Sequence, residues 1–256
     1  HEGTTRVVSK LTVERNGQHS RPLVLDGEGL SVRSISINED QVADSDFTYA
    51  GGKLTLETVP QRFVFGAVVD IEPESNTSLE GLYRSRTMYC TQCEAEGYRK
   101  ITFGLDRPDV LSTFTVSLSA DKTVCPVLLS NGNEVARSDL EDGRHKVVWH
   151  DPHPKPSYLF ALVAGDLQLV ADRFVTQSGK PVDLRIWVEA KDTGYCDHAM
   201  ASLKASMRWD EERYGLEYDL DLFNIVAVDD FNMGAMENKS LNIFNTSCVL
   251  AHPDIT

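Results

Sequence analysis

The 256-residue chain is long enough for one large or two ordinary domains with real cores. Its 39 acidic residues outnumber 25 Lys and Arg, and they are spread along the chain rather than gathered in a tail. Nucleic-acid binding needs clustered cations, so we expect no nucleic-acid partner. No run reaches the roughly 18 apolar residues that a membrane span needs, so we expect no membrane-embedded segment either.

Residues 6 to about 190 consist of short apolar and alternating runs that turn residues separate, a pattern typical of strands. The clearest runs are VVSKLTVE, GLSVRSISI, KLTLETV, FVFGAVVDI and STFTVSLSA. Breaks fall at Asn16-Gly17, Gly51-Gly52, Asn131-Gly132 and Asp142-Gly143, and the Asn-Gly and Asp-Gly pairs indicate hairpins. Because no helical pattern intervenes, we predict an all-β, sandwich-like domain over residues 1–190.

The next segment, Cys196 to Gly215, changes to a helical period. Asp197 is available as the N-cap and Gly215 as the stop. The apolar face of this helix would carry Met200, Leu203 and Met207.

Two strand-like runs follow the helix, LFNIVAV and SLNIFN. A helix followed by such strands indicates the opening of a second, mixed α/β domain over residues 191–256. The last residues stop where a larger domain would only be beginning, so we expect the chain to be a fragment.

The five cysteines cannot all pair, which favours a reducing compartment, and we predict a cytoplasmic protein. Cys90 and Cys93 could form half of a zinc site or a redox pair. The other three cysteines stand alone, so we favour a structural interpretation of the pair.

Three histidines, His145, His150 and His153, lie close together in GRHKVVWHDPHPKP. We interpret this stretch as a hairpin with a proline-rich loop and the histidines as surface residues rather than metal ligands. No His-Glu-x-x-His occurs in the chain, so we expect no metal ligands of that type in it.

Two carboxylates allow both a functional and an ordinary interpretation. Glu94 is two residues after Gln92, so on a strand both side chains would share a face. A solvated polar face is the ordinary interpretation. Glu237 could be an exposed turn carboxylate, but strands that look buried flank it, and a buried charge needs a partner or a cleft.

The motif Gly234-Ala235-Met236-Glu237-Asn238 resembles the exopeptidase signature of the zinc aminopeptidases of the aminopeptidase N family. Upstream, GLYRSRTMYCTQCEAEGYRKITFGLDRPDVLSTF resembles the family's other substrate-binding block. WDEERYGLEYDLDLFNIVAVDDFNMGAMENKSLNIFN is similar to the bacterial alanyl subgroup. The resemblance covers most of the chain and is weakest in the first 70 or so residues.

The resemblance implies a saddle-like N-terminal β-domain followed by the first helix and strands of a thermolysin-like catalytic domain. In this family the zinc ligands and the general base follow the motif. We therefore expect no catalytic and no metal-binding residue in this chain, zinc as the cofactor of a longer enzyme, and no activity from the isolated chain.

The resemblance also assigns substrate contacts. Glu94 and Glu237 would bind the α-ammonium of a peptide with a free N-terminus, with Gln92 and the motif's Asn238 as neighbouring polar groups. Met233 would line the pocket for the first side chain.

Gly234 and Ala235 would let the motif's backbone pair with an extended substrate. For Met236, the pocket and the core remain open alternatives.

Two other functions are possible on the sequence alone. A scaffold relative that has lost catalysis would have no need for an amine-binding pair. The epoxide-opening branch of the family typically has Gly where this chain has Ala235, which disfavours it.

Overall fold

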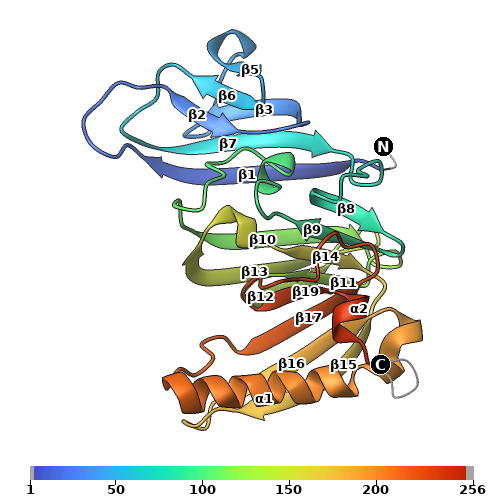
Figure 1. The fold of residues 1–256 in the computed structure, drawn as a ribbon. Coiled ribbons are helices and arrows are strands. Elements are labelled where there is room, and N and C mark those ends of the chain that lie inside the picture. Colours follow the sequence, from blue (N-terminus) through green and yellow to red (C-terminus); the bar gives the residue numbers. More distant parts are fainter. Residues whose placement is uncertain (1–2, 252–256) are drawn as a thin grey trace. The chain divides into compact units, whose positions relative to one another are not determined.

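The computed structural model describes residues 3–251 (Figure 1). Its internal contacts divide the chain into two compact units. The first unit comprises residues 1–84, 91–112 and 155–158, and the second comprises residues 85–90, 113–154 and 159–256. The chain passes between the units more than once, and each unit is described by itself.

The first unit is built on two antiparallel sheets with the strand orders β1-β7-β3-β4 and β2-β6-β5. β7 is central and mostly buried, while β1 alternates between half-buried and exposed residues, so one face of β1 meets solvent. The strands of this unit are β1 (Thr5–Glu14), β2 (Leu23–Asp26), β3 (Ser31–Ile37), β4 (Asp40–Gln41), β5 (Thr48–Ala50), β6 (Lys53–Leu56), β7 (Arg62–Ile71) and β8 (Gly81–Ser85).

The second unit contains three sheets, with the strand orders β10-β13-β12, β11-β14-β9 and β15-β16-β17-β19-β18. We call the last one the mixed sheet, because β17 pairs in parallel with β16 and β19 while the other pairs are antiparallel. The strands that lie wholly or mostly in this unit are β9 (Met88–Gln92), β10 (Ser112–Asp121), β11 (Val127–Ser130), β12 (Asn133–Asp139), β13 (Arg144–Lys155), β14 (Leu162–Gly165), β15 (Gln168–Val175), β16 (Pro181–Val188), β17 (Leu222–Val228), β18 (Ala235–Met236) and β19 (Leu241–Asn245).

Two α-helices and four 3₁₀ helices complete the described chain. These are α1 (Asp197–Tyr214), α2 (Thr246–Val249), η1 (Asp44–Asp46), η2 (Tyr98–Lys100), η3 (Ser157–Leu159) and η4 (Ala190–Tyr195).

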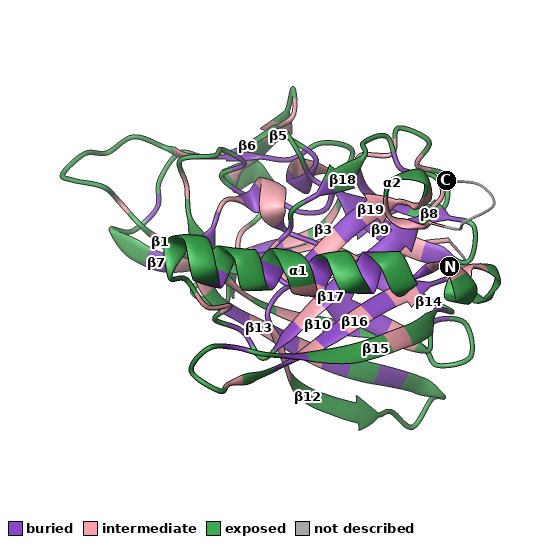
Figure 2. Ribbon diagram, turned by 60° about the horizontal axis from the view of Figure 1, so that its bottom comes forward, coloured by how far each residue is buried: buried purple, intermediate pink, exposed green. Residues whose placement is uncertain are grey.

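Helix α1 covers one face of the mixed sheet (Figure 2). The predicted apolar face is confirmed, because Met200, Leu203 and Met207 are buried in one cluster with alternate residues of β16 and β17. Gly215 ends the helix with a φ of 67°, a left-handed conformation that glycine adopts without strain. The predicted N-cap is wrong: Cys196 holds that position, because η4 brings the chain to the helix already turned, and Asp197 is the first helical residue.

The strand predictions are confirmed, with LFNIVAV forming β17 and most of SLNIFN forming β19. The predicted break at Gly51-Gly52 joins β5 to β6, and the hairpin predicted at Asp142-Gly143 lies between β12 and β13. The hairpins predicted at the two Asn-Gly pairs are wrong. Asn16-Gly17 follows β1, which pairs with β7, and Asn131-Gly132 separates β11 and β12, which belong to different sheets.

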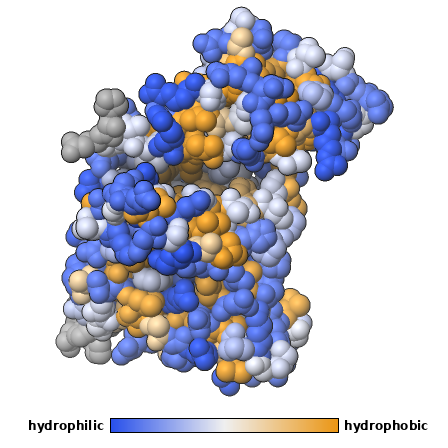
Figure 3. Space-filling view, turned by 180° about the vertical axis from the view of Figure 1, so that it is seen from behind, coloured by the Kyte–Doolittle hydropathy of each residue, from blue (hydrophilic) through white to orange (hydrophobic). Residues whose placement is uncertain are grey.

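Figure 3 shows one face on which hydrophilic residues predominate and hydrophobic ones lie in scattered groups. Within residues 3–251, neither α-helix is long and apolar enough to cross a membrane.

Candidate functional site

The motif residues form an edge of the mixed sheet in the second unit. Ala235 and Met236 make up β18, which pairs antiparallel with β19 through Ala235 opposite Phe244 and Met236 opposite Ile243. β18 stands last in the strand order, so its other side carries no strand among the described residues. An edge strand leaves backbone N–H and C=O groups available to a further strand.

Side chains along the motif alternate between core and solvent. Met236 is 1% exposed and Asn238 is 2% exposed, whereas Ala235 and Glu237 are exposed. This period of two is that of a strand, so Ala235 and Glu237 face the same way, outward. The burial of Met236 favours its core interpretation over the pocket, and the Glu237 carboxylate needs no buried partner.

Side-chain amides hold the backbone around the motif. Asn245 donates from its backbone N–H to the carbonyl of Gly234 at 2.9 Å and from its side chain to the carbonyl of Phe231 at 3.1 Å. The side chain of Asn242 reaches the carbonyl of Met236 at 3.5 Å. The segment is therefore fixed from β19, on its sheet side.

The glycine of the motif is not required by its own surroundings. A Cβ on Gly234 would meet the Sγ of Cys248 at 3.4 Å, an ordinary van der Waals distance. Gly234 is exposed and is not among the described glycines with positive φ. Neither the backbone conformation nor the packing of the described residues requires a glycine at position 234. The space beside it is therefore open to another molecule.

A lysine and an aspartate flank the motif on its C-terminal side. The Nζ of Lys239 lies 2.9 Å from a carboxylate oxygen of Asp219. Burial raises the pKa of Asp219, but the hydrogen bond and charge of Lys239 outweigh it, so the pKa of this carboxyl lies below its ordinary value. The Lys239 charge is thus neutralised locally.

The other two predicted contacts, Gln92 and Glu94, belong to the first unit. The prediction that they share a strand face is wrong, because β9 ends at Gln92 and the chain then turns. Gln92 is 1% exposed, and its side-chain amide donates to the backbone carbonyl of Glu94 at 3.4 Å. Glu94 itself is exposed.

The sequence interpretation of the histidines needs correction. Residues 144–155 form the long strand β13, the second strand of a hairpin with β12, rather than a proline-rich loop, and its alternation turns His145 inward. His145 is 1% exposed, and its Nε2 lies 2.7 Å from the carbonyl of Cys125. His150 and His153 are partly exposed.

Cysteine and metal chemistry find no support in the described residues. Cys90 and Cys93 are buried, and burial raises the pKa of the Cys93 thiol, which makes a reactive thiolate unfavourable. Among residues 3–251, no group of three or more His, Cys, Asp or Glu side chains could hold a metal ion. The described residues therefore do not fit a zinc site.

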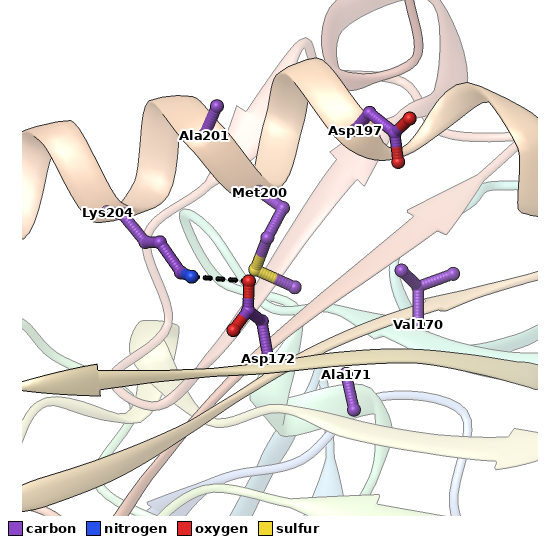
Figure 4. Close-up of a pocket in the computed structure, with 7 residues that line it drawn as sticks. All are labelled: Val170, Ala171, Asp172, Asp197, Met200, Ala201 and Lys204. Carbon is purple, nitrogen blue, oxygen red and sulfur yellow. Dashed lines mark hydrogen bonds and ion pairs between the residues drawn. The ribbon is translucent and has the colours of Figure 1, made fainter.

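A shallow groove lies elsewhere, between α1 and β15 (Figure 4). Its volume is about 380 Å³, and the ion pair of Lys204 with Asp172 crosses it. No predicted site residue lines it, so its size gives no reason to move the candidate site from β18. Its lining residues are Val170, Ala171, Asp172, Asp197, Met200, Ala201 and Lys204.

Comparison with known domains accounts for most of the chain. Residues 2–159 match the Peptidase M1 N-terminal domain, and residues 198–256 match the Peptidase family M1 domain. The chain belongs to the M1 family of peptidases. Aminopeptidase relatives in this family imply a metal cofactor, which the described residues do not hold.

Individual M1 relatives support the assignment. Aminopeptidase N of Caulobacter vibrioides is 53% identical over 253 residues, which are 99% of this chain and 29% of that protein. Aminopeptidase N of Escherichia coli is 54% identical over 250 residues, which are 98% of this chain and 28% of that protein. The chain thus spans less than a third of the length of these relatives.

A solved aminopeptidase structure supports the fold. Aminopeptidase A of Legionella pneumophila, in complex with aspartic acid, superimposes with a TM-score of 0.94 at 36% identity. The match covers 98% of this chain and 30% of that one. The predicted mainly β fold, followed by the start of an M1 catalytic domain, is confirmed.

Asn131 and Gly132, which the sequence did not indicate as site residues, contact the turn that follows the motif. The side-chain amide of Asn131 donates to the carbonyl of Lys239 at 2.9 Å, and the Oγ of Ser240 accepts from the N–H of Gly132 at 2.6 Å. Asn131-Gly132 had the pattern of a hairpin turn, and nothing in its local sequence indicates a partner 108 residues away.

Proposed function

We propose that this chain is the substrate-recognition part of a zinc-dependent aminopeptidase that removes N-terminal residues, Ala-like or of broad type, from peptides. The observation that carries the proposal is the exposed edge strand β18 with the outward-facing pair Ala235 and Glu237. The names of the M1 relatives agree with it.

Strand addition explains the small residues of the motif. An extended peptide can pair with the free backbone groups of an edge strand, provided that no bulky side chain stands in the way. Gly234 and Ala235 meet this condition, and the structure gives no other reason for the glycine. Met233, which is 37% exposed, is placed by the same proposal at the pocket for the first side chain.

Glu237 is proposed to bind the free α-ammonium of the substrate. Such a group has an ordinary pKa of about 7.7 to 8.0, so much of it is charged near neutral pH. A carboxylate forms a charge-assisted hydrogen bond with it that a blocked amine cannot form. Glu94 and Gln92 are proposed for the same amine, and Asn238 as a further polar group of the motif, on sequence resemblance alone.

Changing Glu237 tests this role. In the full-length enzyme, Glu237→Gln should weaken recognition of free-amine substrates by about 1.5 to 3 kcal/mol, the range for a hydrogen bond to a charged group. Steady-state kinetics on an alanyl chromogenic amide measures the effect. Glu212→Gln, an exposed glutamate on α1, is the matched control. Unchanged kinetics for Glu237→Gln would remove this residue from the amine site.

Catalysis is proposed to depend on zinc bound by residues outside this chain. The 256-residue chain alone should therefore not hydrolyse the alanyl amide, with or without added zinc, whereas the full-length enzyme should. Turnover by the chain alone would contradict the proposal. A full-length protein that binds peptides without turnover would instead be a scaffold.

The domain boundary and the compartment are also proposals. A boundary near residue 190 separates β16 from β17, which pair in parallel from Asp183 opposite Leu222 to Trp187 opposite Val226. Domains 1–190 and 191–256 would then share the mixed sheet. A cytoplasmic location rests on the odd number of cysteines.

A further inference from the structure

The turn between β11 and β12 contacts the loop that joins β18 to β19. We call Asn131, Gly132, Lys239 and Ser240 the clamp. All four belong to the second unit, and Asn131, Gly132 and Ser240 are buried. The loop that the clamp holds, residues 237–240, begins with Glu237.

Asn131 uses both ends of its amide. Its Oδ1 accepts from the backbone N–H of Ala161 at 2.7 Å, which fixes the side chain against the start of β14. Its Nδ2 then donates to two carbonyls, that of Leu159 at 3.1 Å and that of Lys239 at 2.9 Å. With the acceptor end anchored, the donor end points in a fixed direction, so the Lys239 carbonyl is held in one place.

Ser240 and Gly132 form the second half of the clamp. Ser240 has a φ of 62°, which is unfavourable for a residue with a Cβ, yet it is 1% exposed. Its Oγ accepts from the N–H of Gly132 at 2.6 Å and lies 3.4 Å from the Gly132 carbonyl. Only glycine fits at position 132, because the φ there is 90° and a Cβ would overlap the carbonyl of His150.

The clamped loop is a tight turn. The N–H of Leu241 donates to the carbonyl of Asn238 at 2.9 Å, and the N–H of Asn224 donates to the carbonyl of Ser240 at 2.8 Å. Glu237 is exposed and is followed at once by this turn. The backbone position of Glu237 therefore depends on the contacts that fix the turn, because its exposed side chain is not held in the core.

We propose that Asn131 is a positioning residue of the aminopeptidase site: through the carbonyl of Lys239 it holds the turn that places Glu237 and Asn238. This inference rests on the proposed function of Glu237. Asn131 acts through the turn and not by touching substrate. It acts because a misplacement of about 1 Å in a binding group can cost a large factor in rate.

Asn131→Ala in the full-length enzyme is the main test, with Ser130→Ala as its matched control. Ser130 is the neighbouring residue, is 0% exposed and donates to the carbonyl of Ala161 at 2.8 Å, which lies just before β14 rather than in the turn after the motif. Both variants remove buried hydrogen bonding to residues 159–161, and Asn131→Ala also removes the bond to Lys239. Asn131→Asp is the second variant, since it keeps the size of the side chain but loses the donor to Lys239.

The kinetic readout is a double-mutant cycle with Glu237→Gln. Asn131→Ala should lower kcat/KM for the alanyl amide about tenfold to a hundredfold, and Ser130→Ala should lower it less than about twofold. Asn131→Ala should have little further effect when Glu237→Gln is already present, because a positioning residue acts through the group it positions. Equal losses in Asn131→Ala and Ser130→Ala, or full additivity with Glu237→Gln, would overturn the proposal.

Hydrogen exchange supplies a readout that does not need activity. The amide of Leu241 and its neighbours in residues 234–245 should exchange faster in Asn131→Ala and Asn131→Asp than in Ser130→Ala, at matched unfolding midpoints. Equal exchange in all variants would show that Asn131 does not hold the turn. If the wild-type enzyme has no aminopeptidase activity, the proposed function fails, while the exchange contrast still decides the clamp.

Discussion

Two regions of the mixed sheet are held in different ways. Under α1, side chains such as Leu184, Ile186 and Val188 are 0% exposed and pack in one apolar cluster. At the opposite edge, Gly234, Ala235 and Glu237 are exposed, and hydrogen bonds hold the backbone. The first region is held by burial and the second by directed bonds.

The two kinds of interaction contribute differently: apolar burial mainly sets the stability of the fold, and hydrogen bonds mainly set the position of the backbone. Burial of apolar surface has no preferred direction and supplies most of the free energy of folding. A hydrogen bond contributes only about 0.5 to 1.5 kcal/mol net, but it fixes a distance and an angle. We expect changes under α1 to reduce stability most and leave the edge in place, and changes at the edge to cost less stability but to displace the edge.

The largest expected effect is in the core under α1. Leu184→Ala should lower the free energy of unfolding of the second unit by about 2 to 5 kcal/mol, because it removes buried methyl groups and leaves a cavity. Urea unfolding of the 256-residue chain, followed by tryptophan fluorescence, reports on this unit, since Trp149, Trp187 and Trp209 all lie in it.

Leu169→Ala, on β15 of the same sheet, is the control for Leu184→Ala. Leu169 is 45% exposed, so its truncation should cost less than about 1 kcal/mol. Similar losses at the two leucines would contradict the view that burial under α1 holds this region. The kcat/KM of the folded full-length enzyme should be unchanged in both variants.

A smaller effect is expected at Ser240, at the edge. Ser240→Ala keeps the left-handed φ of 62° and leaves a buried N–H on Gly132 without its acceptor, at a cost of about 1 to 3 kcal/mol. Ser240→Gly loses the same bond but removes the strain of the left-handed backbone conformation, so it should be more stable than Ser240→Ala by about 1 kcal/mol. The same fluorescence titration measures both, and a glycine variant that is less stable than the alanine variant would refute the assignment of strain.

The smallest effect is expected at the rim of the α1 region. Lys204 pairs with Asp172 across the groove between α1 and β15 (Figure 4), and both side chains are partly exposed. Lys204→Met should cost less than about 1 kcal/mol, as surface ion pairs do, and the cost should shrink further in high salt.

The pH dependence at this pair has a definite sign. The hydrogen bond from Lys204, and then one from the backbone of Arg173, hold the pKa of Asp172 below its ordinary 3.8. A lowered folded pKa stabilises the protein above about pH 4, and the contribution is lost as the pH falls through the folded value. Unfolding midpoints from pH 6 to pH 3 should therefore fall less steeply in Lys204→Met, and an unchanged slope would show that the pair does not stabilise the fold.

Local patterns predicted most of the elements. The period of 3.6 in Met200, Leu203 and Met207 gave the helix, and Gly215 gave its end, because these signals depend only on neighbouring residues. The error at Asp197 was also local in cause: the 3₁₀ segment before the helix replaced a side-chain cap with an already turned backbone.

Errors came where a residue's role depends on distant partners. His145 looked like a surface residue in a polar, proline-rich stretch, but it packs inward on β13 beside the carbonyl of Cys125. Gln92 and Glu94 looked like one strand face, but the strand stops between them. Asn131-Gly132 looked like a hairpin, but its flanking strands pair in different sheets.

The sequence by itself determined the motif from Gly234 to Asn238, the strands around it and the family to which the chain belongs. These features depend only on which residues follow one another and on their short-range periodicity. Only the tertiary structure decided that Met236 is core while Glu237 faces outward, and that Asn131 reaches Lys239 across 108 residues. The physical reason is that a hydrogen bond depends on where two groups lie in space, and pairing of strands into sheets, not chain order, sets those places.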